Sequence, residues 1–530
     1  MPTASEPSLP TTPEGVSTDD TKNASFTKSE SATVPLTIPS HKHSVAHAFS
    51  PIVTIASDTN TTTTSSITAS QGTPRDLIDT TFKVKEKINI RKASIHPGDE
   101  GYDLIDPVCD PKHPHRIQFS DISSAAYSIR DGINRIPCMK AHQLSTWLGV
   151  DLYLKKEYLQ VTGSFKERGA RFALLRLTKE QAAAGAIAAS AGNHALALAY
   201  HGQQLGIPIT VIMPIFAPLM KVSCCKGYGA TVIQHGHDIQ DAKEFGFHYA
   251  REKGMTYING FDHPDVVAGQ GTIGLEILEE VNKLDAVIVP VGGGGLIAGV
   301  ALAIKTLRPE VEVIGVESET CPSFSNALFN SGLAVHPENS LADGLAVPTV
   351  GVNAVYMAKG NVDRIVTVCE ESIALAILRC LEMEKSVVEG AGAVGLAALI
   401  SNKLPHLKGK RVVNILSGGN IDSTVLGRTI ERGLAVDGRL IKFDVVVSDR
   451  PGGIAELATL ICKHGGSIKD MFHERAWLAA NVFSVRVRVV AETRDHDHAD
   501  DLLKELEQHY SQISYQDYRP KFVCSGDESP

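Results

Sequence analysis

Short apolar runs alternate with amphipathic stretches through the middle of the chain. The runs at 207–213, 231–234, 287–291 and 313–316 consist mainly of aliphatic residues. Apolar runs of this length, separated by helical stretches, are typical of strands in a parallel sheet that is buried on both faces. The pattern therefore predicts an α/β region with an open, mostly parallel sheet and helices on both sides.

Three turns rich in glycine and small polar residues come directly after apolar runs. They are Ser190-Ala191-Gly192-Asn193-His194 after 186–189, Gly292-Gly293-Gly294-Gly295 after 286–291, and Ser417-Gly418-Gly419-Asn420 after 411–416. Open α/β sheets bind ligands at the carboxyl ends of their strands. Four consecutive glycines before a helix from Leu296 favour a phosphate site, because they leave N–H groups unshielded. Ser190 and Asn193 could bind a carboxylate or simply cap a helix.

One lysine lies near the start of a predicted helix. Residues 151–157 alternate as a strand does, and Ser164 with Glu167 matches the S-x-x-E pattern of a capping box that opens a helix toward Leu177. Lys166 would then lie at the positive end of the helix dipole, which disfavours its proton and makes it a candidate amine nucleophile. Taken alone, a solvated lysine on a helix face is the commoner interpretation.

After Gly438 the pattern changes to that of a small separate module. It contains a strand at 441–447, a turn at 449–453, an amphipathic helix at 454–464, an alternating strand at 482–490, a helix at 501–509 and a last strand near Tyr515. This order predicts a ferredoxin-like β-α-β-β-α-β module over 440–516 with a tail at 517–530.

The first 85 residues are rich in Ser, Thr and Pro, and we expect them to be disordered. The catalytic domain is then expected over 86–436. Acidic residues such as Glu6 and Glu14 fit poorly with a transit peptide, and no apolar signal core is present, so the cytoplasm is the expected location. A serine- and threonine-rich leader leaves an organellar location open.

Charge and hydropathy exclude several classes of partner. A net charge of −9 without a basic stripe argues against nucleic acid, and apolar runs such as 391–400 are too short to span a membrane. Nine cysteines without a C-x-x-C pair indicate reduced thiols and no zinc site. We therefore expect no nucleic-acid, membrane or metal partner.

Six ordered motifs resemble threonine dehydratase, a fold type II pyridoxal-phosphate enzyme of the tryptophan synthase β type, in a group that also holds serine dehydratases and serine racemases. They are Gly163 to Ala170, Ser190 to His194, Gly292 to Leu296, Leu341 to Val347, Glu389 to Ala393 and Ser417 to Asn420. The resemblance covers roughly 117–436. It implies two subdomains, of which a smaller, mobile one at about 163–237 closes over the substrate.

The resemblance also implies a role for each motif. It implies that Lys166 forms the aldimine with pyridoxal 5'-phosphate and then removes the Cα proton, while Asn193 contacts the ring hydroxyl and Ser417 the ring nitrogen. The cofactor phosphate would lie on Gly292, Gly293, Gly294, Gly295 and Leu296, and the substrate carboxylate on Ser190, Ala191, Gly192, Asn193 and His194.

The reaction implied is β-elimination. A hydroxyl at Ser417 leaves the ring nitrogen largely unprotonated, and this weaker electron sink favours prompt loss of a hydroxyl from the substrate. L-threonine would yield 2-oxobutanoate and ammonia, and L-serine would yield pyruvate and ammonia. Racemases of the group carry a second serine where this chain has Ala191, and the segment 317–323 lacks the aspartate of their metal site. A serine racemase, a β-replacement enzyme and a non-catalytic amino-acid sensor are the alternatives.

The C-terminal turn and helix resemble an ACT-type regulatory domain. In this family such modules bind amino-acid effectors in pairs, so the resemblance implies an effector site in a homo-oligomer, a dimer or a tetramer. The chain has a single copy of this module, which resembles catabolic threonine dehydratases more than the two-module biosynthetic ones. The first would imply a role in threonine catabolism and the second a role in isoleucine biosynthesis. A module that serves assembly alone is the equal alternative.

Overall fold

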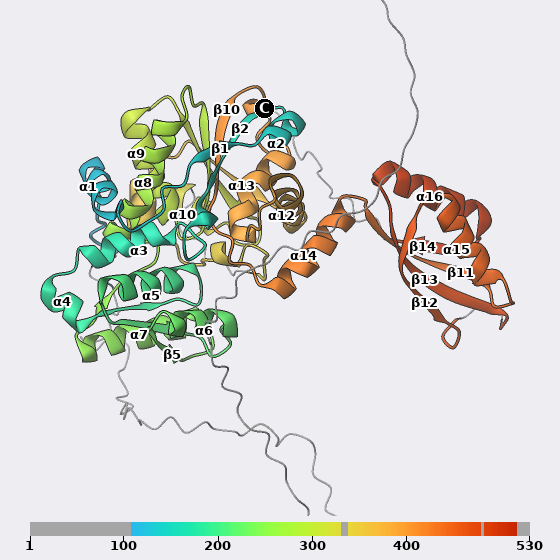
Figure 1. The fold of residues 1–530 in the computed structure, drawn as a ribbon, viewed down its shortest axis with the longest axis horizontal. Helices are drawn as coiled ribbons and strands as arrows, with labels where there is room; N and C mark the ends of the chain where they lie inside the picture. Colours follow the sequence, from blue (N-terminus) through green and yellow to red (C-terminus); the bar gives the residue numbers. More distant parts are fainter. Residues whose placement is uncertain (1–105, 107, 330–337, 479–481, 517–530) are drawn as a thin grey trace, which may run out of the picture. The chain divides into compact units, whose positions relative to one another are not determined.

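The computed structural model describes residues 106, 108–329, 338–478 and 482–516 (Figure 1). The expectations for 1–85 and 517–530 lie outside these residues. Within them, no helix combines the length and the apolar character needed to cross a membrane.

A larger sheet of six strands forms the centre of the catalytic region in the described residues. Its strand order is β1-β2-β10-β7-β8-β9, and only the β1–β2 pair is antiparallel. The strands are β1 (Cys138–Lys140), β2 (Asp151–Lys156), β7 (Ala286–Pro290), β8 (Glu312–Ser318), β9 (Arg364–Val368) and β10 (Arg411–Leu416). The predicted mostly parallel sheet is confirmed.

Helices cover both faces of this sheet, and each face has its own apolar core. Figure 1 shows α8 and α9 on one face and α12 and α13 on the other. The helices that surround the sheet are α1 (Phe119–Ile129), α2 (His142–Leu148), α8 (Pro264–Glu280), α9 (Gly295–Leu307), α10 (Ser323–Phe329), α11 (Val352–Ala358), α12 (Glu370–Glu384), α13 (Gly390–Ile400) and α14 (Ser423–Val436), with short turns η1 (Glu157–Leu159), η2 (Asp343–Leu345) and η3 (Pro405–Leu407).

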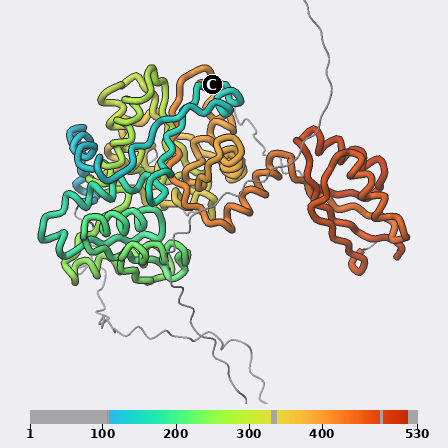
Figure 2. Tube along the Cα trace, in the orientation of Figure 1, coloured from blue at the N-terminus to red at the C-terminus, as the bar shows by residue number. Residues whose placement is uncertain are grey.

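A smaller parallel sheet forms a second layer, ordered β5-β4-β3-β6. Figure 2 shows the chain leaving the larger sheet after β2, building this layer in green and returning to β7. Its elements are α3 (Lys166–Leu175), α4 (Lys179–Ala184), β3 (Ala186–Ala189), α5 (Asn193–Leu205), β4 (Ile209–Met213), α6 (Leu219–Gly227), β5 (Thr231–Gln234), α7 (Ile239–Lys253) and β6 (Thr256–Tyr257). The smaller layer thus extends to Tyr257, beyond the expected segment 163–237. The reason is that β6, which follows α7 in the chain, pairs in parallel with β3.

The C-terminal module has the predicted β-α-β-β-α-β order, although its second strand, β12, was not among the strands located from the sequence pattern. Its elements are β11 (Leu440–Ser448), α15 (Gly453–Lys463), β12 (Ser467–Glu474), β13 (Ser484–Glu492), α16 (His496–His509) and β14 (Ile513–Tyr515). The strand order β12-β13-β11-β14 is that of a ferredoxin-like sheet. Alternate residues of β11 and β13 pack under the two helices in a separate core. The expected fold class is confirmed for both regions.

Four charged side chains are buried together beneath α3. The Arg168 guanidinium donates to both carboxylate oxygens of Glu157 at 2.8 and 2.9 Å and to those of Glu276 at 2.7 and 2.8 Å. Lys155 Nζ donates to Glu276 at 2.7 Å. The side chains of Arg168, Glu157 and Lys155 are 0% exposed. Burial of Glu276 by itself would raise the pKa of its carboxyl group, but the hydrogen bonds and charge of Arg168 hold that pKa below its ordinary value.

We expect Arg168→Met to lower the free energy of unfolding by about 3–5 kcal/mol, because it leaves two carboxylates buried without their guanidinium. Urea unfolding followed by circular dichroism measures the change. The control is Arg130→Met, since Arg130 is 56% exposed and its guanidinium contacts exposed groups, the Asp131 carboxylate and the Tyr127 ring; we expect a change within about 0.5 kcal/mol. A loss as small as the control's would contradict a structural role for the cluster.

Candidate active site

Lys166 is the first residue of α3, as predicted, and its side chain is partly buried. Its Nζ donates to the carbonyl oxygen of Gly260 at 2.6 Å and lies 5.1 Å from the centre of the Phe165 ring. Burial lowers the pKa of Lys166 to about 8, and the nearby Glu389 carboxylate opposes this shift. The amine is therefore much more readily neutral at physiological pH than an ordinary lysine.

The predicted capping box at the start of α3 is wrong. Phe165 is the N-cap residue, and no side chain caps the helix. The Glu167 carboxylate accepts a hydrogen bond from the backbone of Thr162 instead, and its other oxygen lies 3.2 Å from Nε2 of His201. Ser164 is drawn into a short antiparallel bridge with Gly418, and its hydroxyl is buried without a partner among the described residues. Tertiary pairing has thus replaced the local motif.

The four glycines form a tight turn between β7 and α9, as predicted. Gly294 is the N-cap of α9 and has a φ of +95°, and a Cβ there would lie 2.1 Å from the Phe324 ring. A Cβ on Gly295 would lie 2.2 Å from the carbonyl oxygen of Phe261, the residue after Gly260. With no capping side chain, the first amides of α9 remain available to an anion. Leu296 is buried in the core beneath them.

Asn193 joins the first turn of α5 to the larger sheet. Its Nδ2 donates to Glu389 at 2.7 Å, and its Oδ1 accepts from Asn420 at 2.9 Å. The Ser417 carbonyl accepts from the backbone N–H of Phe165 at 3.0 Å, so the end of β10 lies directly beside the start of α3. The side chain of Ser417 is buried in this region.

The rest of the segment after β3 contains Ser190, Ala191 and His194. The Ser190 hydroxyl accepts from the backbone N–H of Gly192 at 3.3 Å, and Ala191 is partly buried. His194 contacts the Ile258 carbonyl oxygen at 3.0 Å through Nε2. Burial, with a contribution from Lys166, lowers the pKa of His194 to about 3, so this ring stays neutral.

Contacts in the structure thus connect Lys166, Asn193, His194, Ser417 and the glycine turn through Gly260, Phe261 and Asn420. Ser190 and Ala191 are in the loop before Asn193 but make no contact with Lys166 in the described residues, and Leu296 belongs to the apolar core. Three contributors had no assigned role from the sequence: the Gly260 carbonyl, the Glu389 carboxylate and the Asn420 amide. Glu389 and Asn420 belong to quoted motifs, but their contacts span 196 and 227 residues of chain. The spacing of residues within a short motif cannot predict contacts between residues this far apart in the chain.

A readily neutral lysine and a glycine turn with free helix amides, both at the carboxyl ends of parallel strands, are the features that an enzyme for a phosphorylated carbonyl cofactor needs. The comparisons agree. Residues 129–418 match the family model described as pyridoxal-phosphate dependent enzyme. The chain is 42% identical over 392 residues to an L-threonine ammonia-lyase of Thermotoga maritima. The aligned region covers 74% of this chain and 97% of that protein.

Two solved structures are also similar. One is the processed form of threonine deaminase isoform 2 from Solanum lycopersicum, with 33% identity, a TM-score of 0.57, and coverage of 60% of this chain and 95% of that one. The other is maize serine racemase, with 31% identity, a TM-score of 0.57, and coverage of 60% and 98%. The chain belongs to the family of pyridoxal-phosphate-dependent enzymes.

The residues present fit pyridoxal phosphate. Lys166 supplies a readily neutral amine, and the α9 N-terminus at Gly294 supplies unshielded N–H groups for a phosphate. The buried Ser164 hydroxyl beside Lys166 lacks a protein partner in the described residues. Such an orphaned polar group is typical of a site built for a polar ligand.

We expect Gly294→Ala to raise the Kd for pyridoxal phosphate by about tenfold or more, because a Cβ there strains the backbone and pushes against Phe324. Absorbance titration of the cofactor-free protein measures the Kd. Gly360→Ala is the matched control, since Gly360 has a φ of +82° but open space around it. Equal Kd values for the Gly294 variant and the parent would contradict the assignment of the cradle.

Proposed function

We propose that this protein is an L-threonine ammonia-lyase that converts L-threonine to 2-oxobutanoate and ammonia, with a lesser activity on L-serine. The observation that carries the proposal is Lys166, an amine with a lowered pKa that contacts the Gly260 carbonyl and follows Phe165, which is hydrogen-bonded to the end of β10 at Ser417. The 42% identity to an L-threonine ammonia-lyase over 74% of the chain supports it. We also keep the cytoplasm as the proposed location.

The proposed roles follow from the chemistry of the residues. Pyridoxal phosphate would supply the electron sink that acidifies the Cα–H bond of an amino acid. Lys166 Nζ removes that proton, and the Gly294 turn holds the phosphate. Ser190 and the backbone N–H groups beside it bind the substrate carboxylate. The Ser417 hydroxyl would hold the ring nitrogen of the cofactor and, unlike a carboxylate, would not keep a proton on it.

Elimination is favoured over racemisation by the residues around Lys166. Racemisation needs a second group that protonates the opposite face of Cα, and Ala191 cannot supply one. Glu317, from the segment compared with the metal site of racemases, uses its two carboxylate oxygens to accept from the backbone of Phe324 and Ser325 at 2.7 and 2.9 Å. A product survey with L-serine separates pyruvate from D-serine, and D-serine as the main product would favour the racemase.

We expect Lys166→Ala to lower the rate of 2-oxobutanoate formation from L-threonine by about 10³-fold or more, because the base is removed. A coupled dehydrogenase assay of the keto acid measures the rate. The control is Lys179→Ala, an exposed lysine at the start of α4, whose rate should match the parent. An unchanged rate in the Lys166 variant would disprove the proposed chemistry.

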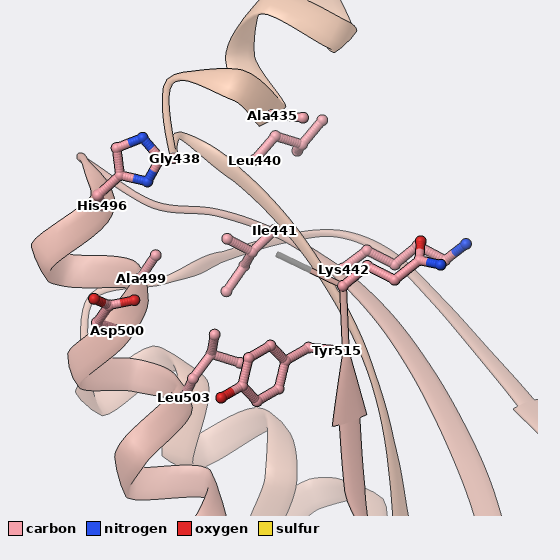
Figure 3. A pocket seen from close by; sticks show the side chains of 11 residues that line it. Ala435, Gly438, Leu440, Ile441, Lys442, His496, Ala499, Asp500, Leu503 and Tyr515 are labelled. Carbon is pink, nitrogen blue, oxygen red and sulfur yellow. The ribbon is translucent and has the colours of Figure 1, made fainter. Parts of the chain in front are cut away.

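For the C-terminal module we propose amino-acid effector binding in a homo-oligomer. A pocket of about 390 Å³ lies at the end of β11, beside the turn at 449–453, and is lined by Val446, Val447, Ser448, Arg450, Phe483, Ser484, Ser511 and Gln512. This volume is within the range of ligand pockets, about 300–1,000 Å³. A second pocket, between α16 and the edge of the sheet at Ile441 and Tyr515 (Figure 3), has about 40 Å³, room for about one water.

We expect Arg450→Ala to raise the concentration of L-isoleucine or L-valine needed for a half-maximal effect by about tenfold, because the guanidinium can pair with an effector carboxylate. Activity titrations measure it, and basal activity should not change. Arg494→Ala, at another exposed arginine of the module, is the control. A flat titration of the parent enzyme with both amino acids would leave the module an assembly role alone.

A further inference from the structure

Glu389 is at the N-cap of α13 but does not cap that helix. Its backbone is extended, with φ −73° and ψ 160°, yet its side chain accepts no capping hydrogen bond. A carboxylate at this position normally accepts from the first turn, where the helix dipole also stabilises it. The side chain is directed instead to Asn193 Nδ2, 2.7 Å from Oε1, and the residue is only 6% exposed. Its direction is therefore set by the active site.

The contact fixes the orientation of the Asn193 amide. Oε1 of Glu389 is the acceptor in this contact, so the carboxyl group takes the nitrogen end of the amide. Asn420 Nδ2 donates to the oxygen end at 2.9 Å and also to the carbonyl of Thr162 at 2.7 Å. Held at both ends, Asn193 commits one N–H to Glu389 and keeps a second N–H for a ligand.

The space for this contact depends on Gly418, at the end of β10. A Cβ added there would lie 2.2 Å from Glu389 Oε1 and 3.2 Å from Asn193 Nδ2. Any larger residue would push the carboxylate off the amide. The absence of a side chain at Gly418 thus leaves room for the hydrogen bond between Glu389 and Asn193.

Several charged groups act on the Glu389 carboxyl. Burial, and then the negative charge of Asp343, raise the pKa of Glu389 to about 7, while Asn193 and Lys221 oppose the shift. The carboxylate in turn favours the protonated amine of Lys166. The side chain is close enough to influence both the amide donor and the amine.

We propose that Glu389 is a positioning residue for cofactor binding: it orients Asn193 so that the free N–H of that amide faces the ring oxygen of pyridoxal phosphate. The inference rests on the proposed cofactor contact of Asn193 and not on the identity of the substrate. Because Asn193 belongs to the smaller sheet layer and Glu389 to the larger, the same contact ties the two layers together at the site.

The test measures cofactor binding in the absence of any amino acid. If the enzyme failed to deaminate threonine, the proposal about Glu389 would therefore still stand or fall on its own result. The Kd for pyridoxal phosphate and the visible absorbance of the lysine-bound cofactor are recorded for Glu389→Ala, Asn193→Ala and the double variant. We expect each single change to raise the Kd by about tenfold and to shift the visible band, because a ring-oxygen donor is misplaced or lost. The double variant should also lie near tenfold, since both changes remove one interaction.

Two further variants separate positioning from a general structural effect. Glu389→Gln keeps an acceptor of the same length, and we expect its Kd to return to within about threefold of the parent. Gly418→Ala removes neither polar group but displaces the carboxylate, so it should reproduce the raised Kd and the band shift. Gly427→Ala, in open space on α14, and Glu371→Ala, in the first turn of α12, are the matched controls.

The proposal is overturned if the effects of Glu389→Ala and Asn193→Ala multiply to about a hundredfold, because Glu389 would then act independently of the amide. It is also overturned if Gly418→Ala leaves both the Kd and the visible band unchanged. The Gly418 result decides the question even where Glu389→Ala does not fold.

Discussion

The pairing of buried charges beneath α3 is the constraint on which the rest of the structure depends. Arg168, Glu157, Glu276 and Lys155 come from elements up to 121 residues apart in the chain. Charges removed from water must be paired with good geometry, so the group has few acceptable arrangements. It therefore joins α3 to β2 and α8 in one relative position. Lys166, two residues before Arg168, takes its place in the site from that arrangement.

The site itself is divided between two layers of the fold. Asn193 and Ser190 follow a strand of the smaller sheet, whereas the glycine turn, Glu389 and Ser417 belong to the larger one. The hydrogen bond from Asn193 to Glu389 crosses between the two layers at the site. The proposed cofactor contact of Asn193 and the alignment of the two layers consequently depend on the same side chain.

Much of this organisation could be predicted from the sequence. The units of strand, glycine turn and helix around 190–194, 292–295 and 417–420 are local, because the apolar run and the turn residues are adjacent in the chain. Most elements of the C-terminal module were predictable for the same reason, but β12 was not located, because almost all its residues are exposed and it has no apolar alternation. The capping box of Ser164 and Glu167 was wrong, because both residues found tertiary partners that the local pattern does not encode.

The sequence by itself determined the class of fold, the lysine at the start of α3 and the glycine turn between β7 and α9, since each rests on residues close together in the chain. Only the tertiary structure decided which groups surround Lys166 and how Asn193 is oriented. The Gly260 carbonyl, Glu389 and Asn420 reach the site across roughly 90 to 230 residues of chain. Contacts of that span are set by how sheets and helices pack, and the desolvation that makes Lys166 readily neutral exists only once they have packed.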